Sequence, residues 1–186
     1  MVAAKLIGVL ALQGGFEAHA HALEDIGARA RRVRVPADLD GLDGLVIPGD
    51  ESTTITLGVE REGLTEPLRE FVRSGRPVLG TCAGLILLDR EHLGLLDVSV
   101  RRNAFGRQLA SFEATLRWED GPLQAIFIRA PWVEEVGEGV EVLAEVDGHP
   151  VAVCRGNVLA VSFHQELTDE RRLHRWLLEH AKVTPA

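Results

Sequence analysis

Short apolar runs alternate with amphipathic stretches through the first half of the chain. The runs are brief and stop at glycine or proline, which is the pattern of buried strands. The amphipathic stretches carry apolar residues at helical spacing, and a glycine follows two of them. Strands that alternate with helices predict βαβ units and a parallel sheet. Strands are expected at residues 6–12, 31–35, 42–47 and 77–80, and helices at 16–26, 64–73 and 83–90.

Beyond Leu93 the pattern changes, because strand-like segments follow one another without helices between them. Turn residues separate the segments, which favours an antiparallel or mixed extension. The segments are 95–101, 111–118, 125–130, 140–146, 151–155 and 158–163, and a closing helix is expected at 171–182. The predicted fold class is α/β, with three αβα layers around a mostly parallel central sheet and helices on both faces. No linker or repeat divides the chain, so one domain over residues 1–186 is expected.

Composition and charge narrow the range of functions. The 186 residues are 46% apolar and 26% charged, as in ordinary globular proteins. The net charge of −8 argues against a nucleic-acid or anionic-membrane surface. Apolar runs are too short to span a bilayer and the N-terminus lacks a signal-peptide pattern, so a cytoplasmic location is expected. The two cysteines form neither a disulfide framework nor a metal-binding pattern, and no metal or cofactor is expected.

Cys82 lies in a Gly-x-Cys-x-Gly pattern between a predicted strand and a predicted helix. The analogous G-x-S-x-G turn presents a nucleophile on a sharp bend, and flanking glycines allow that bend. A helix N-terminus favours a thiolate, and the backbone N–H of Ala83 points toward an oxyanion. A lone cysteine is more often a buried structural residue, and Cys154, which lacks this setting, is interpreted in that way. The setting of Cys82 favours a nucleophile.

His164 and Glu166 directly follow another predicted strand. A thiol nucleophile needs a base within hydrogen-bond reach, and the base needs a group that orients it. A glutamate two residues after the histidine can turn back to the second ring nitrogen. Taken alone, such a pair is more often an ordinary polar surface contact. The other six histidines are interpreted as such ordinary residues on helices and in turns.

The segment 48–54 combines a Pro-Gly bend with a polar string that is expected to begin a helix. Its residues can cap that helix, and its exposed N–H groups can hold an oxyanion or a carboxylate. The two interpretations are equally supported by this segment alone. This segment, the Cys82 turn and the His164 segment all fall at predicted strand ends. Ligands of parallel α/β sheets bind at the carboxyl ends of the strands, which brings the three segments to one edge.

Together these residues resemble the triad-type (class I) glutamine amidotransferases, and more closely the glutaminase subunits of pyridoxal 5′-phosphate synthases. The matching strings are collinear through nearly the whole chain. RNAFGRQ and FIRAP are more specific to this family than GTCAGLILL, which marks the superfamily. The strings are GVLALQGGFEAH (8–19), GLVIPGDESTTI (44–55), PVLGTCAGLILL (77–88), LGLLDVSVRRNAFGRQLASFE (93–113), FIRAP (127–131) and VSFHQELT (161–168).

The resemblance implies hydrolysis of L-glutamine through a thioester at Cys82, with His164 as general base and acid and Glu166 orienting it. It implies Gly49 as an oxyanion donor together with Ala83. The glutamine-binding positions of the family match Asp50, Glu51, Ser52, Arg102, Ile128 and Arg129. Family members bind a barrel-shaped synthase subunit, which uses the ammonia to build pyridoxal phosphate, and the segment around Gln13 lies near that interface in the family.

Three departures from the family pattern bear on activity. Asp50 stands where the family has a second glycine, Gln165 replaces a proline, and the stretch between Asp89 and Leu93 is short. The first departure keeps an alternative open, in which the chain is a non-catalytic or weakly active scaffolding subunit. A glutaminase that serves another acceptor and a redox protein using Cys82 are further alternatives. RNAFGRQ and FIRAP argue against the former, and the His164–Glu166 pair against the latter.

Overall fold

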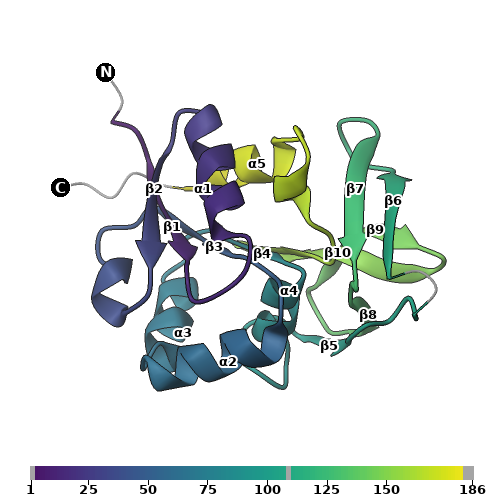
Figure 1. Ribbon diagram of the computed structural model, residues 1–186, viewed down its shortest axis with the longest axis horizontal. Coiled ribbons are helices and arrows are strands. Elements are labelled where there is room, and N and C mark those ends of the chain that lie inside the picture. The colour runs from purple at the N-terminus through teal and green to yellow at the C-terminus, as the bar shows by residue number, and fades with distance from the viewer. Residues whose placement is uncertain (1–2, 108–109, 182–186) are drawn as a thin grey trace.

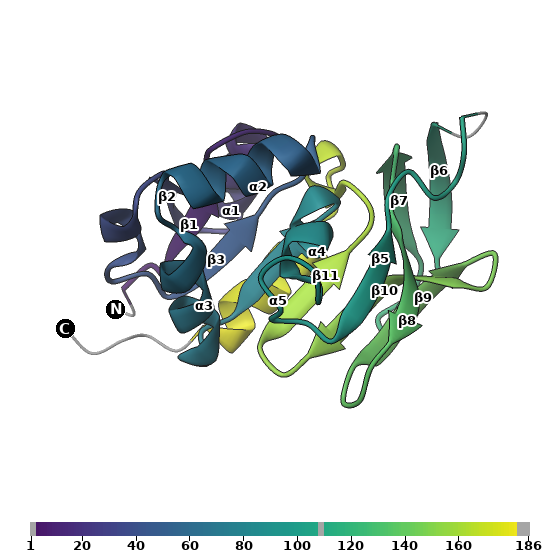
Figure 2. The same cartoon turned by 90° about the horizontal axis from the view of Figure 1, so that it is seen from below.

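The computed structural model describes residues 3–107 and 110–181, and it arranges them in three layers (Figures 1 and 2). Residues 108–109 of the string 93–113 lie outside the described residues, as does residue 182, where we expected the last helix to end. The three-layer α/β architecture that the sequence predicts is confirmed.

The central layer is a sheet of seven strands. They are β1 (Leu6–Leu10), β2 (Arg29–Val33), β3 (Gly44–Ile47), β4 (Val78–Thr81), β9 (Glu141–Val146), β10 (His149–Arg155) and β11 (Val158–Val161). Their order in space is β2-β1-β3-β4-β11-β10-β9. The pairings from β2 to β11 are parallel, whereas β10 runs antiparallel to both β11 and β9. The sheet is therefore mostly parallel with an antiparallel edge, as predicted.

Helices cover both faces of this sheet. In Figures 1 and 2, α1 and α5 lie on one face and α2, α3 and α4 on the other. Their bounds are α1 (Phe16–Asp25), α2 (Ser52–Arg61), α3 (Thr65–Arg73), α4 (Ala83–Leu88) and α5 (Arg172–His180), with short 3-10 turns η1 (Pro36–Leu39) and η2 (Gln165–Leu167). Adjacent strand residues point to opposite faces. Val9 accordingly packs in one apolar cluster with Leu177, and Leu10 in the other with Ile55.

Two small antiparallel sheets extend the molecule at one end. They pair β5 (Val98–Arg101) with β8 (Trp132–Val136), and β6 (Ser111–Leu116) with β7 (Leu123–Ile128). Aromatic rings join the second sheet to the core. The ring of Phe127 stacks on that of Phe112 with centroids 4.6 Å apart, and its centroid lies 5.5 Å from that of Phe163. Since Phe163 precedes His164, this packing fixes the start of the segment that carries His164 and Glu166. The strand β8 was missed by the sequence pattern.

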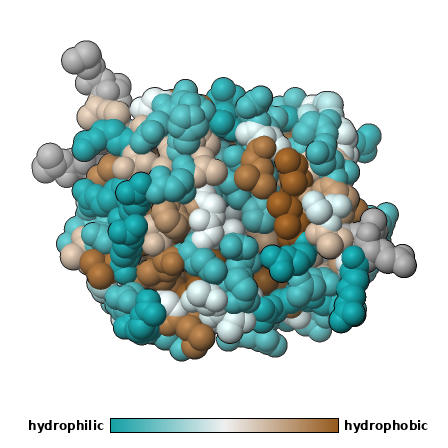
Figure 3. All heavy atoms as spheres, viewed as in Figure 1, coloured by the Kyte–Doolittle hydropathy of each residue, from teal (hydrophilic) through white to brown (hydrophobic). Residues whose placement is uncertain are grey.

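Figure 3 shows a surface on which hydrophobic residues reach solvent in small groups among hydrophilic ones. Large hydrophobic side chains that are exposed come from separate elements, namely Val35, Leu57, Val136, Val142 and Leu167. Within the described ranges, no helix has the length and apolar character needed to cross a membrane.

Candidate active site

A strained turn presents Cys82 between β4 and α4. Its φ of 50° lies in the left-handed region, which residues other than glycine rarely adopt. A Cβ added at Gly84 would collide with the carbonyl oxygen of Ile47, and one at Gly80 would lie 3.0 Å from the backbone of Gly84. The two flanking glycines therefore let the turn fold tightly against the end of β3. This is the strand-to-helix bend that the Gly-x-Cys-x-Gly pattern predicts.

Gly49 lies against this turn. A Cβ at Gly49 would overlap the carbonyl oxygen of Thr81 and the backbone nitrogen of Ala83. Only a glycine fits there, so the main chain of Gly49 stands directly beside that of Cys82. The two backbone segments from which we expected the oxyanion donors, Gly49 and Ala83, are thereby brought together.

His164 and Glu166 approach Cys82 from the neighbouring strand. The backbone N–H of Cys82 donates to Val161 O at 2.8 Å, which ties the turn to the end of β11. His164 Nδ1 lies 2.6 Å from Glu166 Oε1, and the Cys82 thiol is a hydrogen-bond partner of the same imidazole. The imidazole of His164 is thus held by the carboxylate at Nδ1 and also interacts with the thiol.

Their neighbours shift the protonation of His164 and of Glu166. Burial lowers the pKa of His164, but hydrogen bonds to Cys82 and Glu166 and the charge of Glu166 outweigh it and raise the pKa to about 10. Burial alone would raise the pKa of Glu166, whereas its contacts with His19 and His164 lower it below the usual value. The arrangement therefore favours an imidazolium beside an ionised glutamate.

A cavity of about 270 Å³ opens above these residues. Its volume is near the lower end of the range for small-molecule sites, which suits a ligand the size of one amino acid. Every expected substrate-binding residue lines it, and Ala83 is buried just beneath. The lining includes Gly49, Asp50, Glu51, Ser52, Arg102, Ile128 and Arg129. In residues 3–107 and 110–181, no cluster of histidine, cysteine and carboxylate side chains could hold a metal ion.

Glu51 and Arg102 form the exposed rim of the cavity. The Glu51 carboxylate accepts from the N–H groups of Thr53 and Thr54 and so caps α2. The hydrogen bond from the Thr54 hydroxyl and these two backbone bonds lower the pKa of Glu51 to about 2. Arg102 Nη2 lies 3.3 Å from Glu51 Oε1 and 3.1 Å from Thr53 Oγ1. Exposed ion pairs of this kind are weak, so the guanidinium can exchange this contact for that of a bound ligand.

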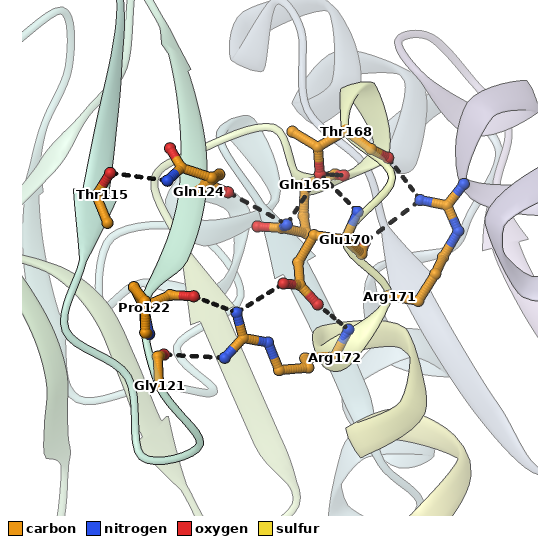
Figure 4. Close-up of polar contacts among 9 residues, drawn as sticks. All are labelled: Thr115, Gly121, Pro122, Gln124, Gln165, Thr168, Glu170, Arg171 and Arg172. Atoms are coloured by element: carbon orange, nitrogen blue, oxygen red, sulfur yellow. Dashed lines mark hydrogen bonds and ion pairs between the residues drawn. The ribbon is translucent and has the colours of Figure 1, made fainter.

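The Gln165 side chain is completely buried and ties down the segment where the family has a proline. Its Nε2 lies 3.0 Å from Thr168 Oγ1 and 3.4 Å from Gln124 O, as Figure 4 shows. The same view shows Arg172 donating to the carbonyl oxygens of Gly121 and Pro122. Hydrogen bonds of the Gln165 amide thus hold this segment in the absence of a proline ring.

One interpretation of the sequence was wrong. His19 and His174 are fully buried side chains, not ordinary surface residues; they contact each other, and His19 also contacts Glu166. The signal was present, because His19 lies at helical spacing between Phe16 and Leu23, on the apolar face of α1. Five further residues of the cavity wall lie inside the family-like strings but were not singled out as site residues: Gly15, Ile86, Asn103, Pro131 and Leu167.

A cysteine on a strand-to-helix turn, beside a histidine–glutamate pair on the next parallel strand, is the arrangement typical of triad-type glutamine amidotransferases. Comparison with known proteins agrees: the chain belongs to the SNO glutamine amidotransferase family, which it matches over residues 9–183.

Individual relatives cover nearly the whole chain. A protein of Mycobacteroides abscessus named pyridoxal 5′-phosphate synthase subunit PdxT is 52% identical, over 96% of this chain and 98% of its own. The PdxT of Geobacillus kaustophilus is 50% identical over 95% and 94%. A crystal structure of a glutamine amidotransferase superposes with a TM-score of 0.89 at 47% identity, covering 94% of this chain and 97% of that one. PurLQS from Thermotoga maritima shares the fold, with a TM-score of 0.75 at 16% identity over 95% and 98%.

The raised pKa of His164 predicts a pH-dependent stability. A group whose pKa is higher in the folded state stabilises that state below its ordinary pKa of 6.5 and loses this effect as pH rises through about 10. The free energy of unfolding should therefore fall across this interval. Urea denaturation at a series of pH values should show a smaller fall for His164→Asn than for the wild type. His21→Asn, at an exposed histidine on α1, is the control and should follow the wild type. Equal slopes in all three proteins would contradict the shift.

Proposed function

We propose that this chain is the glutaminase subunit of a pyridoxal 5′-phosphate synthase, hydrolysing L-glutamine to L-glutamate and ammonia. The observation that carries the proposal is that one imidazole, that of His164, contacts the Glu166 carboxylate at Nδ1 and interacts with the Cys82 thiol in the same cavity. Relatives that cover almost the whole chain at about half identity bear the name of that subunit, which supports the acceptor. The proposed unit is one glutaminase domain over residues 1–186, located in the cytoplasm.

Hydrolysis proceeds in two halves. The Cys82 thiolate attacks the side-chain amide carbon of glutamine, and the carbonyl oxygen becomes an oxyanion facing the N–H groups of Gly49 and Ala83. The His164 imidazolium gives its proton to the amide nitrogen, which leaves as ammonia when the C–N bond breaks. The neutral imidazole then takes a proton from water as the water attacks the thioester. Collapse of this second intermediate breaks the C–S bond and restores the thiolate–imidazolium pair. The new side-chain carboxylic acid loses its proton to solvent and leaves as glutamate.

Glu166 and the cavity rim orient these steps. Glu166 accepts from His164 Nδ1 and stabilises the imidazolium, so that Nε2 serves the thiol and the leaving group. Arg102 is the cationic group that can leave its weak contact with Glu51 for the α-carboxylate of glutamine. Asp50, Glu51, Ser52, Ile128 and Arg129 form the remaining walls of the proposed binding site.

The proposed partner is a barrel-shaped synthase subunit that takes up the ammonia. The segment 13–15 packs on the oxyanion segment, since a Cβ at Gly14 would lie 2.9 Å from Gly49 O and 3.2 Å from Asp50 Cβ. A partner that docks on this segment can therefore act on the peptide orientation of Gly49. Interaction with nucleic acid or membrane forms no part of the proposal.

The alternative of a non-catalytic scaffold, based on Asp50, has less support. Gly49 keeps the close approach to the Cys82 turn that a donor requires, and His164 interacts with both Cys82 and Glu166. Asp50 itself is exposed at the cavity wall. We find no observation that favours the scaffold over the enzyme.

Removing the nucleophile or its base should abolish hydrolysis. We expect Cys82→Ala and His164→Asn each to lose glutamate release under saturating synthase subunit, with the double variant little worse than either, because the two groups act as a unit. Cys154→Ala is the matched control, since that half-buried cysteine lies on β10, packs against an apolar cluster and hydrogen-bonds Gly156 O. Near-wild-type turnover of either single variant would remove the assignment.

The isolated chain should turn over glutamine slowly and accelerate clearly when the synthase subunit is added. The reason is that unused ammonia is wasted, so hydrolysis is coupled to docking through the segment at Gly49. Glutamate release with and without the subunit, with complex formation followed by gel filtration, measures the effect. A bound complex with unchanged turnover would argue against coupling.

Asp50→Gly should change turnover by less than about tenfold, roughly 1.4 kcal/mol in barrier height. The physical reason is that the donor at this bend is a main-chain N–H of Gly49, while the Asp50 side chain is solvent-exposed. Steady-state kinetics of the activated complex test this. A large gain in rate, with the pH–rate profile displaced to lower pH, would mean that the carboxylate faces the thiolate and that the native site is partly disabled.

A further inference from the structure

Two buried histidines lie behind the proposed triad and have no part in the mechanism above. His19 belongs to α1 and His174 to α5, the two helices on one face of the sheet, and neither side chain is exposed. His19 Nδ1 lies 2.9 Å from His174 Nε2, so one of the two nitrogens donates to the other. Buried polar groups are costly unless they are paired, which makes this pair a specific feature of the core.

The second ring nitrogen of His19 faces the triad. His19 Nε2 lies 3.1 Å from Thr81 Oγ1, in the residue before Cys82, and 3.3 Å from Glu166 Oε2. Glu166 Oε1 is engaged by His164, whereas Oε2 is buried and accepts no well-aligned hydrogen bond within the described parts of the chain. The His19 nitrogen is therefore the polar group that meets the free side of the carboxylate. Contacts of this kind in unliganded enzymes are often long and tighten when substrate binds.

The charges assign the protons of the pair. A lone pair on His19 Nε2 would face the anionic Glu166 oxygen, so Nε2 carries the hydrogen. In a neutral ring Nδ1 is then the acceptor, and His174 donates from Nε2. His174 Nδ1 is left as a bare lone pair, and this atom is buried without a hydrogen-bond partner among the described residues. An unpaired N–H there would be the costlier alternative, because imidazole N–H groups donate strongly.

The same packing keeps the pair neutral. A cationic His19 would need a hydrogen on both nitrogens, which would force His174 to bury an unpaired N–H on Nδ1. Burial lowers the pKa of His19, against the raising effect of Glu166, and burial together with His19 and Arg171 lowers the pKa of His174 to about 3. The charged and titratable groups that face the pair are Glu166, His164 and Arg171, and of these only Glu166 favours protonation.

We propose that His19, oriented and kept neutral by His174, is a positioning residue that holds the free oxygen of Glu166 without neutralising its charge. A neutral N–H fixes the direction of the carboxylate, while the full negative charge remains available to the His164 imidazolium. The inference rests on the proposed function, because Glu166 matters only where His164 serves Cys82. His19 also touches Thr81 and thereby joins the nucleophile strand to the carboxylate.

Two amide substitutions separate positioning from packing. In His19→Gln the amide nitrogen can occupy the place of Nε2 and reach Glu166, whereas in His19→Asn it reaches only the place of Nδ1 and His174. Both variants bury one polar amide, so we expect them to change the stability of the fold by similar amounts. His21→Gln, on the exposed side of the same helix, is the control. All proteins carry Cys154→Ala, so that Cys82 is the single thiol.

Two readouts are compared for the complex with the synthase subunit: steady-state glutamine turnover, and the pH dependence of Cys82 alkylation by iodoacetamide. We expect His19→Asn to lower kcat by about tenfold or more with KM within about threefold, because small misplacements in a site are costly. A buried carboxyl that loses its N–H neighbour is protonated more easily, so Glu166 would support the His164 imidazolium less well. The pH profile of Cys82 alkylation in His19→Asn should therefore move to higher pH. His19→Gln should stay within about threefold of the control in kcat.

The experiment distinguishes a failure of the positioning role of His19 from a failure of the proposed glutaminase function. If the control lacks glutaminase activity but the alkylation profile differs between the Asn and Gln variants as expected, the proposed function fails and the positioning role stands. Equal loss in both variants, a loss carried by KM, or an unchanged alkylation profile overturns the positioning role. Failure of both variants to fold would identify the pair as a packing requirement and would overturn it as well.

Discussion

The parallel pairing of β4 with β11 is the constraint on which the site depends. The register places Thr81 opposite Val161, and the backbone N–H of Cys82 continues the ladder by donating to Val161 O. The chain after β11 then carries His164 and Glu166 to the same edge, where Cys82 begins its turn. Because side chains alternate along a strand, a slip of one residue would turn each group to the opposite face and separate the thiol from the imidazole. The hydrogen bonds that stabilise this ladder therefore also determine the geometry of the site.

Contacts between backbones complete what the register begins. Gly84 meets the carbonyl of Ile47, and Gly49 meets the backbone on both sides of Cys82, so β3 and β4 are locked together at their carboxyl ends. Main-chain groups locked in this way can act as pre-organised donors, which is the form of stabilisation that the proposed oxyanion requires. Side chains at the rim are held far more weakly, as the exposed contact between Glu51 and Arg102 illustrates. The site thus combines a rigid base with an adjustable rim.

The sequence predicted the elements whose ends are marked by glycine or proline, and with them the strand ends that carry Cys82 and His164. It missed β8, which follows Pro131 and carries two successive glutamates, so that neither apolar alternation nor a clean start marks it. It also missed the role of His19 and His174. Their burial can be read from helical spacing, but their meeting cannot, because it joins residues 155 positions apart through the packing of two helices on one sheet face. Local pattern gives the face of a helix, whereas only the tertiary structure gives the partner.

Three buried histidines show how the fold sets the protonation of each imidazole. His174 contacts His19, His19 contacts Glu166, and Glu166 contacts His164. His174, His19 and His164 are all buried, yet the pKa of His174 is lowered to about 3 and that of His164 is raised to about 10. Burial disfavours the charged form of each ring, so the difference lies in their neighbours. Beside burial, His19 and Arg171 disfavour the protonation of His174, whereas a thiol and an ionised carboxylate favour that of His164. Glu166 can offer one full charge, and a cation on His19 would compete with His164 for it. Neutrality on one side of the carboxylate is therefore the physical condition for a stable imidazolium on the other.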